Sequence, residues 1–231
     1  MSLQEYYLRK IGVNIVYDKE KQHDFVAFID FKEKNVCPEF DAHLVINGEC
    51  EDVTKTQVEK IFSYVFGYDS FVDTDNYGVC VKKSEKQCAK SFTVMETPCE
   101  KQDGYVYQKF INNRIAIDRV RDYRFYFAWD EFVLIQRDKH IDGIFYGGKA
   151  EQTFLKVDWR KYFTQDEISK IISVKNLLGM DVGAVDVVRD YSENKVYFLD
   201  ANNISGIPDF IKHAIEPDYM NIFKTELNKR L

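Results

Sequence analysis

The sequence lacks the features of a membrane-spanning or secreted chain. None of its apolar runs approaches the roughly 20 residues that a transmembrane helix needs. The amino-terminal segment MSLQEYYLRK contains no apolar signal core and no small-residue cleavage site. We therefore expect a cytoplasmic protein with neither a membrane span nor a secretory signal.

Cysteine and histidine are too scattered to predict a metal or disulfide framework. The five cysteines are an odd number, widely spaced, and include no Cys-x-x-Cys pair. Free thiols in a reducing compartment are the expected state. None of the four histidines is paired at metal-ligand spacing, and no Ser/His or Cys/His arrangement predicts a protein nucleophile.

The charge and the length set broad limits on function. A net charge of −6 argues against a general nucleic-acid or anionic-membrane surface, although it leaves local basic pockets open. At 231 residues, the chain is long enough for one large domain or two small lobes with an ample core. It contains no internal repeat and no low-complexity linker, so any lobes are expected to pack together.

Apolar periodicity predicts a mixture of strands and a few helices. Helices are expected over residues 53–69, with Gly67 as the stop, and over 164–180, where Thr164 and Glu167 form a capping box. A last helix is expected from Pro217 to Leu227. Short β-like runs fill the rest, at residues 13–17, 24–31, 42–47, 77–84, 91–96, 103–111, 123–129, 131–138 and 144–151. The pattern indicates an α+β fold.

The strongest chemical signal lies between residues 179 and 206. Asp186 occupies the apolar run GAVDVV, and Asp200 and Asn202 occur in KVYFLDAN after the turn-like segment RDYSEN. Two such runs predict a β-hairpin, in which Asp200 and Asn202 share one face and meet Asp186. Two carboxylates and an amide oxygen suit a hard cation such as magnesium. A solvated strand end is the alternative, but unpaired carboxylates in apolar runs are costly.

These strings resemble the carboxyl-terminal signature of the ATP-grasp superfamily. GAVDVV, a turn and VYFLDANNISGIP are similar to a pattern in which an Asp on one strand and a Glu/Asp-x-Asn pair on the next bind magnesium and ATP. The resemblance implies an ATP-grasp fold, with two α+β lobes of antiparallel sheets that hold ATP between them. It also implies that Asp186, Asp200 and Asn202 are the metal ligands.

Weaker strings extend the resemblance towards the amino terminus. Lys82 in GVCVKK resembles a phosphate-binding lysine that points into a cleft, and Lys83 would then point to the opposite face. YVYQKFI resembles the interlobe hinge, where the Gln108 side chain and the backbone of Lys109 and Ile111 would contact adenine. The ATP-binding residues implied by the resemblance are Lys55, Lys82, Gln108, Lys109, Phe110 and Ile111. Each lysine would otherwise be an ordinary surface residue.

Two arginines are implied as catalytic residues. RDYRFYF resembles an Asp-x-Arg strand of the branch that contains ribosomal-modification glutamate ligases and related peptide ligases, and it includes Arg124. Arg137, in VLIQRDK, occupies a position where that branch carries a basic residue near the γ-phosphate. Such cations would stabilise the charge that develops during phosphoryl transfer. Either arginine could instead be a salt-bridged strand residue.

The chain also departs from the resemblance at several points. The segment SEKQCAK at 84–90 contains no glycine, although the family usually closes a glycine-rich loop over the phosphates. DGIFYGGKAE at 142–151 lacks the Arg and Asn of many peptide-ligase relatives. The expected domains are a short β-rich region at 1–53, a nucleotide-binding lobe at 54–115 and a metal-binding lobe at 116–231.

The resemblance predicts an ATP- and Mg²⁺-dependent ligase that joins a carboxylate to an amine through an acyl phosphate. The expected substrates are a carboxylate and an amine of unknown identity, and a peptide or a carrier is an expected bearer of one of them. Two alternatives stay open: an ATP-grasp kinase that phosphorylates a hydroxyl, and a non-catalytic nucleotide-binding or interaction protein. A partner protein or a homo-oligomer could supply what the short amino-terminal region lacks.

Overall fold

The computed structural model describes residues 26–28, 44–85, 92–141, 152–203 and 209–231. Most of the predicted amino-terminal region, most of the glycine-free segment at 84–90 and the predicted strand at 144–151 lie outside these residues. The described strands are β1 (Val26–Phe28), β2 (Leu44–Ile46), β3 (Gly78–Ser84), β4 (Phe92–Thr97), β5 (Tyr105–Lys109), β6 (Arg114–Ala116), β7 (Arg119–Ala128), β8 (Glu131–His140), β9 (Gln152–Lys156), β10 (Val182–Asp190) and β11 (Lys195–Asn202). The helices are α2 (Lys55–Phe66), α3 (Gln165–Leu177) and α4 (Asp209–Asn228), with a short 3₁₀ turn at Trp159–Lys161.

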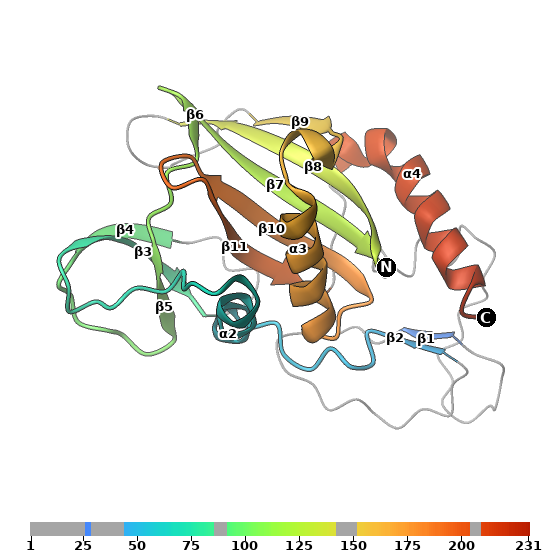
Figure 1. Ribbon diagram of the computed structural model, residues 1–231, viewed down its shortest axis with the longest axis horizontal. Helices are drawn as coiled ribbons and strands as arrows, with labels where there is room; N and C mark the ends of the chain where they lie inside the picture. Colours follow the sequence, from blue (N-terminus) through green and yellow to red (C-terminus); the bar gives the residue numbers. More distant parts are fainter. Residues whose placement is uncertain (1–25, 29–43, 86–91, 142–151, 204–208) are drawn as a thin grey trace.

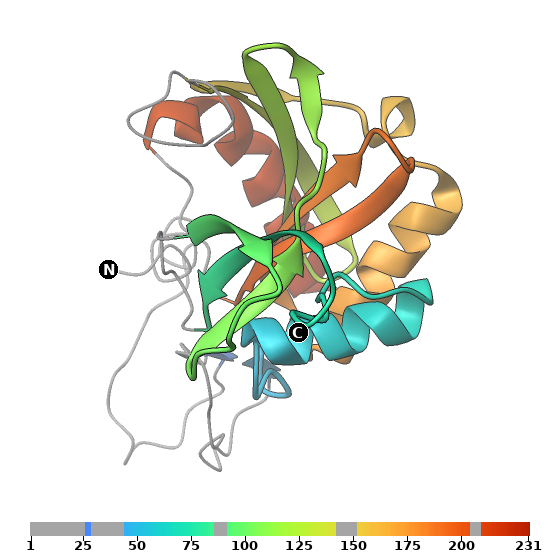
Figure 2. The same ribbon diagram turned by 90° about the vertical axis from the view of Figure 1, so that its left-hand side faces the viewer.

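The described strands form two antiparallel sheets and one small parallel pair. The six-stranded sheet has the order β11-β10-β7-β8-β9, and β6 pairs with β7 at its edge. The three-stranded sheet has the order β4-β3-β5, and β1 pairs with β2. Figure 1 shows the three-stranded sheet beside the large one, and Figure 2 views the molecule from the side of the small sheet. The predicted α+β fold is confirmed.

The two predicted helices near the sheets begin and end where their capping residues stand. The Thr54 side chain accepts a hydrogen bond from the backbone of Gln57 at the start of α2, and Gly67 ends that helix in the left-handed conformation. Thr164 and Glu167 form the predicted capping box at the start of α3. Local sequence therefore determines the ends of α2 and α3.

The last helix is longer than the sequence predicted. The sequence predicted a start near Pro217, but α4 begins at Asp209 and contains Pro217 in its interior. Its apolar residues Tyr219, Phe223 and Leu227 are buried against the six-stranded sheet, which stabilises the helix despite the proline. No helix in the described part of the chain is long and apolar enough to cross a membrane.

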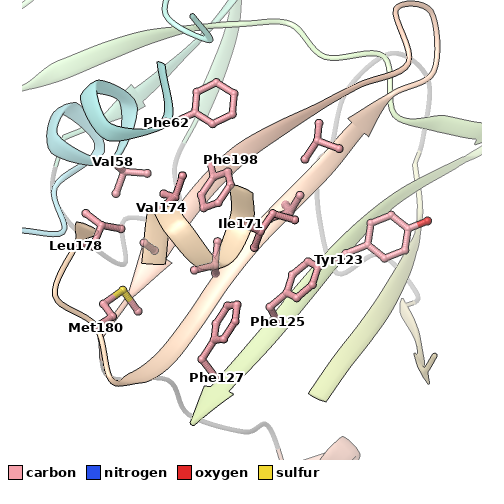
Figure 3. Close-up of a cluster of buried hydrophobic side chains, with 14 of the residues drawn as sticks. Val58, Phe62, Tyr123, Phe125, Phe127, Ile171, Val174, Leu178, Met180 and Phe198 are labelled. Carbon is pink, nitrogen blue, oxygen red and sulfur yellow. The ribbon is translucent and has the colours of Figure 1, made fainter. Parts of the chain in front are cut away.

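The six-stranded sheet is covered on both faces. One face forms the main core with α2 and α3, where Phe125 and Phe198 pack against Ile171 and Val174 (Figure 3). The opposite face packs against α4 and forms a second, smaller core that includes Tyr126. Apolar side chains alternate between these two cores along β7, as expected for a strand buried on both sides.

Candidate functional site

A charged cluster occupies the end of the sheet face that α4 covers. Tyr126 of β7 packs in the core beneath α4. Because side chains alternate along a strand, Asp122 and Arg124 lie on the same face and just before it. In the sheet register, Asp186 of β10 lies opposite Arg124, and Arg137 of β8 lies opposite Asp122. On this sheet face, charged residues therefore replace apolar ones on the side of Tyr126 where Arg124 and Asp122 lie.

Asp186 is held by two arginines. Its two carboxylate oxygens accept hydrogen bonds from Nε and Nη2 of Arg124, both at 2.6 Å, and Oδ1 also lies 2.9 Å from Nη2 of Arg137. Burial alone would raise the pKa of Asp186, but the charges of Arg137 and Arg124 outweigh it and lower the pKa well below its usual range. Asp186 is therefore an ionised carboxylate whose two oxygens are both occupied.

A second carboxylate joins the arginines to β8. Asp122, which is 4% exposed, accepts hydrogen bonds from Nε of Arg137 and from the Lys139 ammonium. Arg137 thus bridges Asp122 and Asp186. Among these residues the cations outnumber the carboxylates, so the cluster as a whole is suited to an anionic ligand.

Asp200 and Asn202 lie beside this cluster on the neighbouring strand. Asp186 and Asp200 are register partners in the β10–β11 hairpin, as the sequence predicted, and Asn202 is opposite Ala184 on the same face. The Asn202 amide donates to Asp200 at 3.4 Å, and Lys55, at the start of α2, has its ammonium 3.8 Å from the Asp200 carboxylate. Burial raises the pKa of Asp200, and the charge of Lys55 offsets this only in part. Asp200 is therefore a carboxylate that further positive charge would stabilise.

The donor set of Asp200 and Asn202 fits a magnesium ion that also binds phosphate oxygens. Mg²⁺ is commonly bound by one or two carboxylates together with waters and substrate phosphates. Asp186 fits this role less well, because both of its oxygens already accept from guanidinium groups. Within the described residues, no three His, Cys, Asp or Glu side chains are grouped as a metal site. Asp200 and Asn202 could hold the ion only together with ligand oxygens.

The two adjacent lysines of β3 point in the directions opposite to those predicted. The Lys82 ammonium contacts the Gln102 side chain and lies 4.2 Å from the centre of the Tyr105 ring, away from the charged cluster. Lys83 instead donates to Oε1 of Gln108 at 2.5 Å. Burial lowers the pKa of Lys83 to about 8, against the opposing charge of Asp200. The side chain that faces the site is therefore that of Lys83.

The register of the small sheet explains this correction. Val81 pairs with Gln108, and Lys83 lies on the same face because it is two residues further along β3. That face lines a pocket, whereas Lys82 shares the other face with Tyr107. The choice between the lysines depends on which face of β3 turns towards the large sheet.

The pocket between the two sheets has a volume of about 250 Å³. Its walls come from β3, β4, the hinge segment after β5 and the charged end of the large sheet. Its lining is mainly apolar with a few charged groups, as is typical of small-molecule sites. The lining residues are Val81, Lys83, Phe92, Val94, Gln108, Lys109, Phe110, Ile111, Asn112, Asn113, Arg114, Val120, Asp122, Lys139, Ile141, Val188 and Leu199.

The four predicted hinge residues, Gln108, Lys109, Phe110 and Ile111, all line the pocket, but polar groups of Gln108 and Lys109 are bonded to protein partners. The Gln108 side-chain amide donates to the Ser70 hydroxyl at 2.8 Å and to the Phe198 carbonyl oxygen at 2.9 Å, so the amide is not directed at a ligand. The backbone N–H of Lys109 donates to the Ser70 carbonyl oxygen at 2.7 Å.

The Lys109 side chain points to the turn between β10 and β11. Its ammonium contacts the Glu193 carboxylate and lies 3.4 Å from the Tyr197 hydroxyl. The geometry therefore does not support the predicted adenine contact through the Gln108 side chain. Of the Lys109 backbone, the N–H already has a protein partner, and a contact through the backbone of Lys109 or Ile111 stays a prediction.

Sequence reasoning missed Lys83, Asp122 and Lys139. Lys83 and its neighbour Lys82 follow three consecutive apolar residues, Val79, Cys80 and Val81, so the local pattern does not indicate which lysine faces the pocket. Asp122 is the acidic residue of the Asp-x-Arg string, but it was assigned no role from the sequence, and Lys139 lies in a charged stretch at the end of β8, where solvated residues are common. The contacts of Asp122 with Arg137 and with Lys139 are visible only in the tertiary structure.

The fold is similar to that of the ATP-grasp ligase PsnB. A PsnB complex with a minimal precursor has a TM-score of 0.53 and 14% sequence identity, covering 80% of this chain and 64% of PsnB. A PsnB complex with a phosphomimetic precursor variant, Mg and ADP has a TM-score of 0.53 and 12% identity, covering 81% and 62%. A third complex, with the precursor peptide PsnA2 and AMPPNP, has a TM-score of 0.51 and 12% identity, covering 81% and 63%.

Sequence comparison adds no relative to this set. No family model and no curated protein matches the chain. The chain spans less than two thirds of the length of the PsnB chains to which it is similar. The structural likeness and the arrangement of the two sheets nevertheless agree with the fold that the sequence signature predicted: the protein has the ATP-grasp fold.

Proposed function

We propose that the protein is an ATP- and Mg²⁺-dependent ligase that activates a carboxylate as an acyl phosphate and transfers the acyl group to an amine. The observation that carries this proposal is the convergence of cations from both sheets beside Asp200 and Asn202, at the edge of a mainly apolar pocket. An apolar pocket suits a purine, and the cations suit its phosphates. We keep residues 54–115 and 116–231 as the two proposed lobes.

Each part of the cluster has a proposed role. Lys83 and Lys55 would bind the ATP phosphates as point charges. Asp200 and Asn202 would hold magnesium, which, when bound, neutralises charge on the phosphoryl group. Arg124 and Arg137 would stabilise the negative charge that develops during transfer, and Asp186 would keep both guanidinium groups in place rather than bind the metal.

The proposed chemistry needs no protein nucleophile. A substrate carboxylate oxygen attacks the γ-phosphorus, the bond to ADP breaks, and an acyl phosphate forms. An amine then attacks the acyl carbon, the carbon–oxygen bond breaks, and phosphate leaves while the amine loses a proton. The chain's own contribution is to bind, orient and neutralise charge. Because PsnB binds precursor peptides, we further propose a carboxylate on a peptide as the substrate.

Calorimetric titration with a non-hydrolysable ATP analogue tests the nucleotide site. We expect the wild type to bind the analogue in a magnesium-dependent manner. Asp200→Ala should lose this magnesium dependence without unfolding, and Lys83→Met should weaken binding. Lys82→Met is the matched control, because it removes the adjacent ammonium that points away from the pocket. Equal effects of the two lysine variants would contradict the corrected site.

Hydroxylamine trapping tests the ligase chemistry. An acyl phosphate formed from ATP and a panel of acidic peptides would be captured as a hydroxamate together with ADP. Transfer of phosphate to a peptide hydroxyl, with no hydroxamate, would identify a kinase instead. Magnesium-dependent binding with neither product, across a panel of acidic and hydroxyl-bearing peptides, would argue against the ligase proposal.

A further inference from the structure

A chain of buried hydrogen bonds connects helix α2 to Lys83. The Glu59 carboxylate, 7% exposed, accepts from the backbone N–H and the hydroxyl of Ser70, and also from the N–H of Phe71 at 2.9 Å. The Ser70 hydroxyl accepts from Nε2 of Gln108 at 2.8 Å. Oε1 of Gln108 accepts from the Lys83 ammonium at 2.5 Å. Glu59, Ser70 and Gln108 are all buried.

The direction of every bond in this chain is determined. The Ser70 hydroxyl donates its one hydrogen to the Glu59 carboxylate, so it can only accept from Gln108. The Gln108 amide nitrogen also donates to the Phe198 carbonyl oxygen at 2.9 Å. If the amide rotated by half a turn, its oxygen would face that carbonyl oxygen and its N–H₂ would face the Lys83 ammonium. Both contacts would be repulsive, so Oε1 is held towards Lys83.

We propose that Glu59, Ser70 and Gln108 are positioning residues that hold the Lys83 ammonium in place for the phosphates of a nucleotide. This inference rests on the proposed function, and it gives Gln108 a role different from the adenine contact predicted from sequence. A lysine side chain has several rotatable bonds, and fixing it in advance reduces the entropy lost when a phosphate binds. The buried carboxylate at the far end of the chain also favours a positive charge at Lys83.

A double-mutant cycle distinguishes positioning from a general structural effect. Affinities for magnesium–AMPPNP and for adenosine would be measured by calorimetry in the wild type, Ser70→Ala, Lys83→Met and the double variant. We expect Ser70→Ala to weaken AMPPNP binding by about threefold to tenfold, the range of one hydrogen bond. Adenosine has no phosphate, so its affinity should not change. In the Lys83→Met background, Ser70→Ala should have no further effect on AMPPNP.

Two further variants make the test specific. Ser63→Ala is the matched control, because the Ser63 hydroxyl donates to the same Glu59 carboxylate at 3.3 Å but is not part of the chain. It should leave AMPPNP affinity unchanged. Glu59→Gln keeps the side-chain volume and should reproduce the effect of Ser70→Ala, which provides the test if Ser70→Ala does not fold.

The outcomes separate this inference from the proposed function. Suppose that the wild type binds AMPPNP. If Ser70→Ala and Glu59→Gln do not weaken this binding, or if they weaken it as much with Met at position 83 as with Lys83 present, the positioning role is wrong. The nucleotide site would still stand in either case. An equal loss of adenosine affinity would likewise show a general distortion. If the folded wild type binds no AMPPNP at all, the proposed function itself fails, and this inference fails with it.

Discussion

Asp186 and Asp200 are opposite each other in the β10–β11 hairpin, yet only the neutralisation of Asp186 should lower the stability of the fold. Arg124 and Arg137 hold the Asp186 carboxylate, and their charges lower its pKa despite its burial. Asp200 has weaker partners, and burial raises its pKa. Replacement of each by asparagine keeps the shape of the side chain, removes its charge and turns one acceptor oxygen into a donor. The pair therefore forms its own matched control.

The expected change in the free energy of unfolding depends on the charged groups that remain around each substituted residue. Asp186→Asn leaves two buried guanidinium groups with one fewer counter-charge, and removing one partner of a buried ion pair costs about 3–5 kcal/mol. Because Arg137 keeps its contact with Asp122, we expect the lower end, about 3 kcal/mol. Asp200→Asn removes a charge that the folded state disfavours at pH 7. The free energy of unfolding should then stay unchanged or rise, by at most about 1 kcal/mol.

Urea unfolding at several pH values, without nucleotide or magnesium, measures both effects. The lowered pKa means that Asp186 contributes its full stability above the unfolded value of about 3.9 and loses it as the pH falls through the folded value. The deficit of Asp186→Asn should thus be complete at pH 7 and shrink below about pH 4. Any gain from Asp200→Asn should also fade on acidification, because the wild-type residue becomes protonated. Equal destabilisation by both variants at pH 7 would refute the distinction between the two carboxylates.

Two further predictions concern the parts that support the hairpin. Gly179 has φ of 69°, and a Cβ there would lie 2.1 Å from the Glu49 carbonyl oxygen, so Gly179→Ala should cost about 3 kcal/mol. Gly104 has a similar φ of 77°, but among the described residues only its own chain neighbours lie within 4 Å of a Cβ placed there, so Gly104→Ala should lower the free energy of unfolding by only about 1 kcal/mol. If urea unfolding shows equal losses for the two variants, the steric argument is wrong. Thr164→Ala removes the capping side chain of α3 and should lower the free energy of unfolding by about 1 kcal/mol, whereas Thr164→Ser should retain it. No difference between those two variants in thermal unfolding would argue against the capping contribution.

The sequence by itself determined the features that depend on neighbouring residues. Thr54 and Gly67 delimit α2, and Thr164 begins α3, because capping side chains satisfy backbone groups within a few positions. The β10–β11 hairpin was also predictable, since two apolar runs joined by a short polar turn favour it, but Asp186 lies opposite Asp200 because the register shifts at a β-bulge between Asp186 and Val187. The ATP-grasp fold was implied by the resemblance of GAVDVV and VYFLDANNISGIP to the signature of that superfamily.

Only the tertiary structure decided which side chains meet at the site. Lys82 and Lys83 are neighbours in a strand, and the packing of the small sheet against the large one selects the face that carries Lys83. Arg124 is 62 residues from Asp186 in the sequence, so its bidentate contact depends on the pairing of β7 with β10. Long-range contacts of this kind are set by the sum of packing across both sheets, and no local pattern encodes them.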